Sequence, residues 1–394
     1  MSQAQQRRYL YHHEDILQQL NDQNPLSYKL TVIHAAIRSQ YPFVDRLAVA
    51  VYDNKTDILK TYIHSTPDQE PPLVNYQSRL ADAASLQEIV TLQKPRVVNN
   101  LRIFSDGSRE HTKKIQKHGF AASYTMPMYH NDTFYGFVFL NSLQANVFDE
   151  AVLPQLDVYC HLIAMLIINE QNAIRTLLSS VKTAQDITHF RDFETGNHIE
   201  RMARYARLIA AHLAQRYQLS DDYIEHVFSF AALHDIGKIA IPDRILHKPG
   251  KLNEEEKKLM QTHPAKGREI IDCILSDFDL NAFEQTDILR NIAECHHEAV
   301  NGSGYPRGLT GSEIPLEARI VAVADVFDAL VSKRPYKEAW SNDRAFATLR
   351  RMANVQLDTD CVNALIDNID QIEEIQVQFK DRNGQAAEQV QCVN

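Results

Sequence analysis

The stretch FAALHDIGKIAIP, residues 230–242, decides the fold of the second half of this 394-residue chain. An apolar run leads directly into His234 and Asp235, so the sequence predicts a buried helix end that carries these two polar side chains. Adjacent residues on a helix diverge by about 100°. The pair therefore suits two neighbouring metal ions better than a single ion.

Further histidines and carboxylates lie on both sides of this pair in the sequence, at spacings typical of metal ligands. Glu194 and His198 are four residues apart, so on a helix they face the same way. The other candidates are His263 in LMQTHPAKG, the adjacent pair His296 and His297, and Asp325 in ARIVAVADVFDAL. Carboxylates and imidazoles without a thiolate suit iron, manganese or zinc. We predict two or three divalent ions, and we expect iron or manganese.

The alternative for each histidine is an ordinary place in a hydrophobic core. One histidine on an apolar helix is more often a hydrogen-bonded core residue than a metal ligand. The three carboxylates and five imidazoles of this set, however, have no other way to offset the cost of burial on apolar helices. Metal coordination is therefore the favoured interpretation.

Length and composition favour two globular domains joined by a connector. At about 100 to 200 residues per domain, 394 residues exceed a single core, and 44% hydrophobic with 23% charged residues is an ordinary globular balance. The formal net charge of -10 argues against a polymeric nucleic acid as partner.

Five cysteines without a CxxC spacing indicate neither a disulfide framework nor a zinc ribbon. We expect a cytoplasmic protein with no membrane segment, because no apolar run suits a signal peptide or a membrane span.

The first half mixes predicted strands with predicted helices. Segments rich in β-branched and aromatic residues predict strands at RLAVAVYD (46–53), LKTYIHST (59–66), ASYTMPMYH (122–130) and TFYGFVFLNS (133–142). Asn131 and Asp132 separate the last two, which predicts a hairpin at the centre of an antiparallel sheet. Helices are expected at 27–40 and 85–93, and a further strand at 95–100. The sequence therefore predicts an α+β domain.

This order of elements resembles a GAF domain over residues 26–168. The resemblance rests on the pattern of strands and helices and on no diagnostic motif. It implies a pocket over one face of the sheet that holds an unknown small molecule. A module that serves only dimerisation or structure is an equal alternative.

A long helix is predicted between the two halves, from Asp149 to Gln185, because this stretch has no glycine and its single proline falls near the start. Ile167, Ile174 and Val181 recur at heptad spacing. We expect these residues to form the seam of a parallel homodimer. The alternative is a helix that packs on its own domain.

Several motifs in the second half resemble the HD-GYP family of the HD phosphohydrolase superfamily. They are ETG (194–196) with His198, HDIGK (234–238), HHE (296–298), Gly302 and Gly304 with Tyr305 and Pro306, and RPY (334–336) after Asp325. These separated motifs agree with the family in order and spacing. The resemblance spans about residues 182–370 and implies an all-α HD-type helical bundle.

The resemblance also implies a reaction and its metal ligands. The expected activity is hydrolysis of cyclic di-GMP to linear pGpG and, as in some members, on to GMP. The implied ligands are Glu194, His198, His234, Asp235, His263, His296, His297 and Asp325. Asp235 is expected to bridge two ions and to act as a catalytic residue, and Glu194 marks members that hold a third ion.

Further residues are implied as catalytic groups or substrate contacts. Lys238, Arg334 and Lys337 fall where family members contact substrate phosphates. Lys238 and Asp328 are the remaining implied catalytic residues, with Asp328 near the nucleophilic water. Tyr305 is a candidate for stacking on a guanine of the substrate.

The loop 301–309 contains one departure from the family, because Asn301 stands where the family usually has Asp. Asn keeps the turn-forming character of Asp but loses the charge, so we expect the loop to keep its shape. The loop is a candidate lip of the substrate site or docking surface for a diguanylate cyclase partner. A tight structural turn is the alternative.

Two other functions remain open. One is hydrolysis of another cyclic dinucleotide such as 3',3'-cGAMP, because the motifs do not include the contacts that select a base. The other is a non-catalytic receptor for cyclic di-GMP. Loss of a metal ligand would favour the receptor, and every implied ligand is present.

These expectations divide the chain into five segments. They are an N-terminal extension (1–25), a GAF-like sensory domain (26–168), a connecting helix (150–185) that overlaps its end, an HD-GYP catalytic domain (182–372) and a C-terminal tail (373–394). The sensory domain is expected to regulate the catalytic domain.

Overall fold

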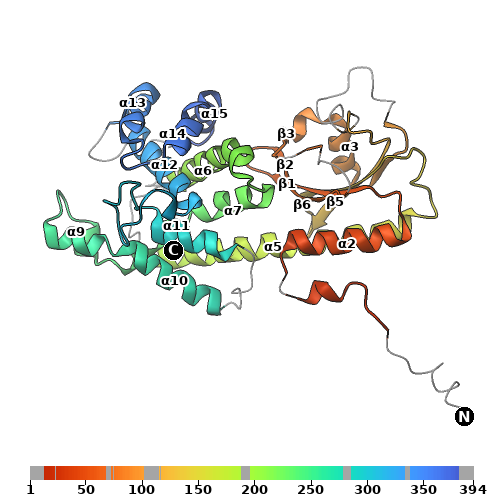
Figure 1. Cartoon of the computed structure of the whole chain (residues 1–394), viewed down its shortest axis with the longest axis horizontal. Helices are drawn as coiled ribbons and strands as arrows, with labels where there is room; N and C mark the ends of the chain where they lie inside the picture. Colours follow the sequence, from red (N-terminus) through yellow and green to blue (C-terminus); the bar gives the residue numbers. More distant parts are fainter. Residues whose placement is uncertain are drawn as a thin grey trace, which may run out of the picture. The chain divides into compact units, whose positions relative to one another are not determined.

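The computed structural model describes residues 13–22, 24–67, 72–73, 75–101, 115, 117–187, 196–277, 285–332 and 338–380, except for the side chains of 181–187 and 196. The chain forms two compact units, Met1–Gln171 and Asn172–Asn394 (Figure 1). The described strands all belong to the first unit, and the second is helical. The α+β prediction for the first half and the all-α prediction for the second are confirmed.

Six antiparallel strands form one sheet in the first unit, in the order β3-β2-β1-β6-β5-β4. They are β1 (Arg46–Asp53), β2 (Ile58–Ser65), β3 (Gln77–Arg79), β4 (Arg96–Val98), β5 (Ala122–His130) and β6 (Thr133–Ser142). The helices of this unit are η1 (Gln18–Asn21), α2 (Leu26–Gln40), η2 (Leu80–Asp82), α3 (Ala84–Leu92) and the first part of α5 (Leu153–Ile187). Strands β1, β5 and β6 begin and end where the sequence predicts. Strand β3 escapes prediction because its three residues, QSR, show no apolar alternation.

The hairpin between β5 and β6 lies where the sequence predicts it. Asn131 and Asp132 have left-handed backbone angles, with φ of 47° and 59°. Two consecutive positive φ angles give a turn whose twist matches that of the flanking strands, and Asn and Asp tolerate them. Because β6 also pairs with β1 on its other side, the hairpin lies inside the sheet.

The two faces of the sheet are covered differently, since alternate residues of a strand point to opposite faces. One face packs on α2 and α5, which Figure 1 shows along the same side of the sheet; Val49 of β1 and Ile163 of α5 belong to this core. On the other face, Leu86 and Ile89 of α3 pack with Phe137 of β6. The second face is only partly covered by α3.

The helix α5 begins in the first unit and ends in the second, which confirms the long helix predicted between the halves. The predicted role of Ile167 and Ile174 in a dimer seam is wrong, because both are buried in their own chain. Ile167 is 0% exposed in the core of the first unit, and Ile174 is 6% exposed in the core of the second. The side chain of Val181 lies outside the described residues. At Ile167 and Ile174, the two of these positions that the structure describes, the helix packs on its own chain.

The second unit follows from the end of α5. Its helices are α6 (Gly196–Tyr217), α7 (Asp221–Ala231), η4 (Ile236–Ala240), α8 (Asp243–Leu246), α9 (Glu254–Met260), α10 (His263–Asp277), α11 (Thr286–Cys295), η5 (Gly311–Glu313), α12 (Leu316–Val331), α13 (Asn342–Met352), α14 (Thr359–Ile366) and α15 (Ile369–Gln378). Ile209, Ile292 and Val323 are fully buried in its core. Helix α15 continues past the predicted domain end at 372, so residues 373–378 are helix and not tail. Residues 381–394 of the predicted tail lie outside the described residues.

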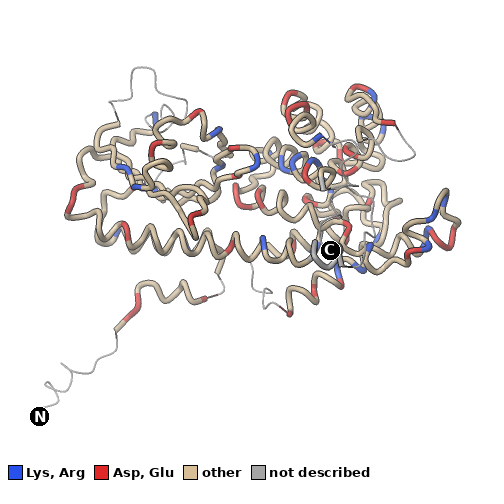
Figure 2. Tube along the Cα trace, turned by 180° about the vertical axis from the view of Figure 1, so that it is seen from behind, with Lys and Arg blue, Asp and Glu red and all other residues tan. Residues whose placement is uncertain are grey.

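Charged residues of both signs share the same elements. Figure 2 shows Lys and Arg interspersed with Asp and Glu along the described parts of both units. In α9, three Glu occupy the first turn and two Lys the last, an order that complements the helix dipole. Among the described helices, none has both the length and the apolar character that a membrane span needs.

Burial of Ile174 within its own chain predicts a stability effect. Replacement of Ile174 by Ala should lower the free energy of unfolding by about 2 to 5 kcal/mol, because it leaves a cavity in the core. Replacement of Met165, which lies on the same helix but is 63% exposed, should change it by less than about 0.5 kcal/mol. Denaturant unfolding with light scattering measures both. An Ile174→Ala protein with unchanged stability and half the mass in solution would contradict this account and would support the dimer seam instead.

Candidate metal centre

The turn that carries His234 and Asp235 follows the buried end of α7. Gly237, two residues after Asp235, comes so close to α10 that a Cβ atom there would lie 1.9 Å from the carbonyl oxygen of His263. Only glycine permits this approach. The contact therefore brings His263, the first residue of α10, to the side of Asp235.

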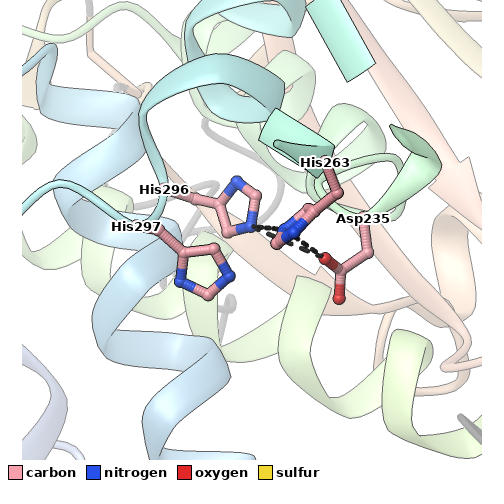
Figure 3. A group of neighbouring side chains, drawn as sticks. All are labelled: Asp235, His263, His296 and His297. Atoms are coloured by element: carbon pink, nitrogen blue, oxygen red, sulfur yellow. Dashed lines mark hydrogen bonds and ion pairs between the residues drawn. The ribbon is translucent and has the colours of Figure 1, made fainter. Parts of the chain in front are cut away.

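Four candidate ligands form the first cluster, in which Asp235, His263, His296 and His297 each offer an atom within 4.8 Å of the others. They come from the turn after α7, the start of α10 and the end of α11. Figure 3 shows Asp235, His263 and His296 converging, with His297 beside His296. Nε2 of His263 lies 3.1 Å from Oδ1 of Asp235, and Nε2 of His296 lies 3.7 Å from the same oxygen.

A second cluster consists of His198 from α6, His234, and Asp325 from α12, again with ligand atoms within 4.8 Å of one another. Nε2 of His198 lies 3.8 Å from Oδ1 of Asp325. Both histidines are buried, with His198 5% and His234 1% exposed. The candidate ligands that the structure describes thus divide into two adjacent groups.

The carboxylate of Asp235 faces both clusters. Its Oδ1 is the oxygen near His263 and His296, whereas its Oδ2 lies 3.1 Å from Nε2 of His234. Nζ of Lys238 also lies 2.8 Å from Oδ2. One carboxylate therefore presents one oxygen to each group of imidazoles.

Hydrogen bonds to backbone carbonyls determine which nitrogen of three imidazoles carries the proton. Nδ1 of His234, His263 and His296 each donates to the carbonyl oxygen three residues earlier, over 2.9, 2.8 and 3.2 Å. A carbonyl oxygen only accepts, so Nδ1 carries the proton and Nε2 of the neutral ring presents a lone pair. In each ring Nε2 is the nitrogen near Asp235. This orientation of donors is typical of metal-binding histidines.

The protonation states also suit metal ligands. Burial lowers the pKa of His296, and burial together with the neighbouring His296 lowers the pKa of His297 to about 2. Burial alone would raise the pKa of Asp235, but Lys238 and His234 outweigh burial and hold it well below its usual range. Neutral imidazoles and an ionised carboxylate are the forms that bind metal ions.

A buried acceptor tests whether the residues fit a cation. Oδ1 of Asp235 is buried and, within the described part of the chain, accepts no hydrogen bond of acceptable geometry. A buried charged oxygen in this state is costly unless a cation balances it. Nitrogen and oxygen donors without thiolate are suited to iron, manganese or zinc. The two clusters therefore fit divalent metal ions.

The expected position of Asp328 beside the nucleophilic water is wrong. Asp328 is 0% exposed, and its carboxylate accepts a hydrogen bond from Nδ1 of His198 at 2.7 Å. Arg201 donates to both of its oxygens, at 2.7 and 3.0 Å. Burial would raise the pKa of Asp328, but His198 and Arg201 outweigh burial and lower it. Asp328 lies behind His198 and turns Nε2 of that ring toward Asp325.

The loop after α11 brings Tyr305 next to the first cluster. The buried carboxylate of Glu298 accepts two backbone N–H bonds from this loop, at 2.7 and 2.9 Å. Gly304 packs so closely that a Cβ atom there would lie 2.5 Å from Cα of Glu298. The ring of Tyr305 stacks on His297, with centroids 4.9 Å apart. Its stacking on a guanine stays a prediction.

Asn301 keeps the turn at the start of this loop, as its side-chain chemistry predicts. Its Oδ1 accepts hydrogen bonds from the backbone N–H and the hydroxyl of Ser303, at 3.0 and 2.7 Å. Either Asn or Asp can accept these bonds. The departure from the family therefore leaves the local geometry of the turn intact.

Three predicted site residues, Glu194, Arg334 and Lys337, lie outside the described residues. Conversely, Arg201 and Glu298 shape the site although the sequence assigns them no role. Arg201 follows His198 by three residues, so a helix places both on one face. That spacing was a signal, because a charged residue on a buried face needs a partner.

The hydrogen bond between Asp328 and His198 predicts an effect on metal binding. Asp328→Asn should weaken binding of one ion by about 10- to 100-fold, because a neutral amide has one acceptor oxygen where the carboxylate has two for the donors of His198 and Arg201. Ser332→Ala removes only a hydroxyl that donates to Asp328 at 2.8 Å and should have a smaller effect. Metal titration of both proteins, with thermal unfolding as the fold control, measures this. Equal metal affinities in wild type and Asp328→Asn would contradict the positioning role.

Comparison with known proteins agrees with this geometry. Residues 193–361 match the HD domain family. The cyclic di-GMP phosphodiesterase response regulator of Xanthomonas campestris pv. campestris is 48% identical over 190 residues, which cover 48% of this chain and 47% of that protein. The 3'3'-cGAMP-specific phosphodiesterase 2 of Vibrio cholerae is 37% identical over 191 residues, 48% of this chain and 34% of that protein. The chain thus spans about half the length of these relatives or less.

Among solved structures, the GAF domain of an Acinetobacter phosphoenolpyruvate-protein phosphotransferase aligns with 44% of this chain and 98% of that domain. The sequence identity is 15% and the TM-score is 0.31. The match to the HD domain family covers residues that include both clusters. The match to the HD domain family over residues 193–361 of the helical half therefore agrees with the resemblance of the HDIGK and GYP motifs to the HD-GYP family.

Proposed function

We propose that the helical half is a metal-dependent phosphodiesterase that hydrolyses cyclic di-GMP to linear pGpG, and further to GMP. The observation that carries this proposal is the position of Asp235, whose two carboxylate oxygens face different groups of imidazoles. This arrangement suits two ions that share one carboxylate, and paired ions are a recurrent device for phosphodiester cleavage. The relative named as a cyclic di-GMP phosphodiesterase supports the choice of substrate.

The two clusters supply a separate ligand set for each of two ions. The first set is Asp235, His263, His296 and His297, and the second is Asp235, His198, His234 and Asp325. Glu194 is the proposed ligand of a third ion. Iron and manganese are the proposed metals, because imidazole and carboxylate donors suit both.

Bound ions would lower the pKa of a water molecule and neutralise charge on the phosphoryl oxygens. The chain itself orients the donors and holds the substrate. Lys238, 2.8 Å from Oδ2 of Asp235, adds a positive charge at the edge of both clusters and is proposed to contact a phosphate. Arg334 and Lys337 are proposed to bind phosphate oxygens as well, where a guanidinium can grip two oxygens. Tyr305 is proposed to stack on a guanine.

Regulation of this half by the first unit is part of the proposal. The helix α5 joins the two units, and two tyrosines tie it to the sheet. Tyr62 of β2 donates to Glu170 at 2.6 Å, and Tyr124 of β5 donates to Asp157. A change in the sheet would therefore act on a helix that continues into the catalytic unit.

The loop 301–309 is proposed as the docking surface for a diguanylate cyclase partner in the cytoplasm.

The mixed dinucleotide 3'3'-cGAMP is the second candidate substrate. A relative named as specific for it is 37% identical over 191 residues of this chain. Selection between guanine and adenine depends on a few contacts to the base, since a site that hydrogen-bonds one base rejects an analogue that leaves its polar groups unpaired. Hydrolysis rates of the two dinucleotides, measured side by side, separate the two candidates.

Loss of the shared carboxylate should abolish the reaction. The double replacement of His234 and Asp235 by Ala should remove measurable hydrolysis of cyclic di-GMP and reduce metal content, since it removes ligands of both ions. His212→Ala is the matched control, because this histidine of α6 is exposed and pairs with Asn368 away from both clusters. Chromatography of the products and elemental analysis measure the outcome. A double variant that keeps its metal and still hydrolyses cyclic di-GMP would contradict the proposed mechanism.

A further inference from the structure

The end of helix α15 lies beside the start of α6, the helix that carries His198 of the second cluster. Helix α15 is held on the second unit by Ile372, which is fully buried in its core. Gln376 adds a reciprocal pair of amide hydrogen bonds with Asn342 of α13, over 2.8 and 3.1 Å. The last residues of α15 therefore have a fixed place next to α6.

The end of α15 offers two backbone carbonyl oxygens to α6. The last carbonyl oxygens of a helix have no partner within the helix and carry partial negative charge. The carbonyl oxygen of Phe379, the residue that follows α15, accepts a hydrogen bond from Nη1 of Arg201 at 2.8 Å. That of Lys380 accepts one from Nδ2 of Asn197 at 3.2 Å. Two residues of α6, one on each side of His198 in the sequence, thus bind the end of α15.

The side chain of Phe379 makes a further contact with α6. Its ring lies against the guanidinium of Arg204, whose Cζ is 4.4 Å from the ring centroid. Arg204 follows Arg201 by about one turn of α6 and is 8% exposed. A cation over an aromatic face is attracted to it, and more strongly where water is excluded. The ring therefore anchors the residue whose carbonyl oxygen meets Arg201.

Arg201 connects the end of α15 to the second cluster. Its Nε and Nη2 donate to the two oxygens of Asp328, at 2.7 and 3.0 Å, while its Nη1 donates to Phe379. The guanidinium is planar, so these donors point in fixed directions. Arg201 is 5% exposed, and loss of the Phe379 carbonyl would remove an acceptor from a buried donor. Because Asp328 also accepts the Nδ1–H of His198 at 2.7 Å, the position of Arg201 bears on the orientation of that imidazole.

We propose that the end of α15 is a positioning element of the second cluster, and that Phe379 is a positioning residue for the ion held there. Phe379 acts through Arg201 and Asp328 on His198, and not as a ligand. It lies beyond residues 193–361, which match the HD domain family, so the support of the site extends past the matched segment. This inference rests on the proposed metal-dependent function.

Titration of the full chain with Mn²⁺ tests this proposal. Phe379→Ala removes the ring that anchors the end of α15, and it should weaken binding of one ion by about tenfold, the lower end of the effect of losing the hydrogen-bond partner of a ligand. Binding at the first cluster should keep its wild-type affinity. Phe379→Tyr keeps the aromatic face and should bind Mn²⁺ like the wild type. Val377→Ala is the matched control, because Val377 lies on the same helix but is 79% exposed.

A double variant shows whether the effect passes through Arg201. Arg201→Lys keeps the positive charge but loses the planar fork that reaches Asp328 and Phe379 together. It should weaken binding of the same ion by about 10- to 100-fold. Phe379→Ala added to Arg201→Lys should weaken it no further, because the two residues act along one path. Independent effects on the stability of the fold would instead multiply.

Anomalous diffraction from crystals of the Phe379→Ala protein, at a Mn²⁺ concentration below saturation, identifies the weakened ion. The peak beside His198 and Asp325 should lose occupancy, and the peak beside His263 should keep it. Wild-type affinity in Phe379→Ala, an equal loss in Val377→Ala, equal loss at both peaks, or multiplied effects in the double variant would overturn this inference alone. A wild-type chain that binds no Mn²⁺ would overturn the proposed function and this inference with it.

Discussion

The helical half depends on one carboxylate that lies between two groups of imidazoles. Asp235 can take this position because Gly237 lets the backbone after it touch α10. That contact brings His263 to one carboxylate oxygen, while His234, the preceding residue, stays beside the other. A side chain at Gly237 would push α10 away and open the first cluster. The close approach of Gly237 to α10 and the position of the Asp235 carboxylate between the two groups of imidazoles are therefore parts of the same feature.

The hydrogen bonds that the ionisable groups of the site make to the surrounding protein offset the cost of burying them. Carbonyl oxygens near the ends of α7 and α11 and before α10 accept the Nδ1–H of three histidines. The carboxylate of Asp328, to which Arg201 donates, accepts the Nδ1–H of His198 in the same way. Each ring thus has one nitrogen satisfied by the protein and the other directed at the site. The same helical core therefore both stabilises the fold and orients the candidate metal ligands.

The sequence predicts three strands to the residue because the composition of a strand is a local signal, and the motifs name the candidate ligands that the structure brings together. Segments rich in β-branched and aromatic residues set the bounds of β1 and β5, and the candidate ligands on both sides of His234 in the sequence indicate the centre. The position of Asp328 could not be predicted. Its spacing from Asp325 places it one turn further along α12, but that spacing does not say which helix packs against it. Ile167 and Ile174 mislead for a similar reason. Heptad spacing shows that a helix packs against something, and it does not say whether the partner is another chain or the same one.

Anomalous diffraction from crystals of the full chain loaded with manganese tests the central claim most directly. The account predicts two manganese peaks about 3.5 to 4 Å apart, one on each side of Asp235 and each in contact with one of its carboxylate oxygens. His263, His296 and His297 should surround one peak, and His198, His234 and Asp325 the other. A single peak that does not contact Asp235, or peaks only at other places on the chain, would contradict it.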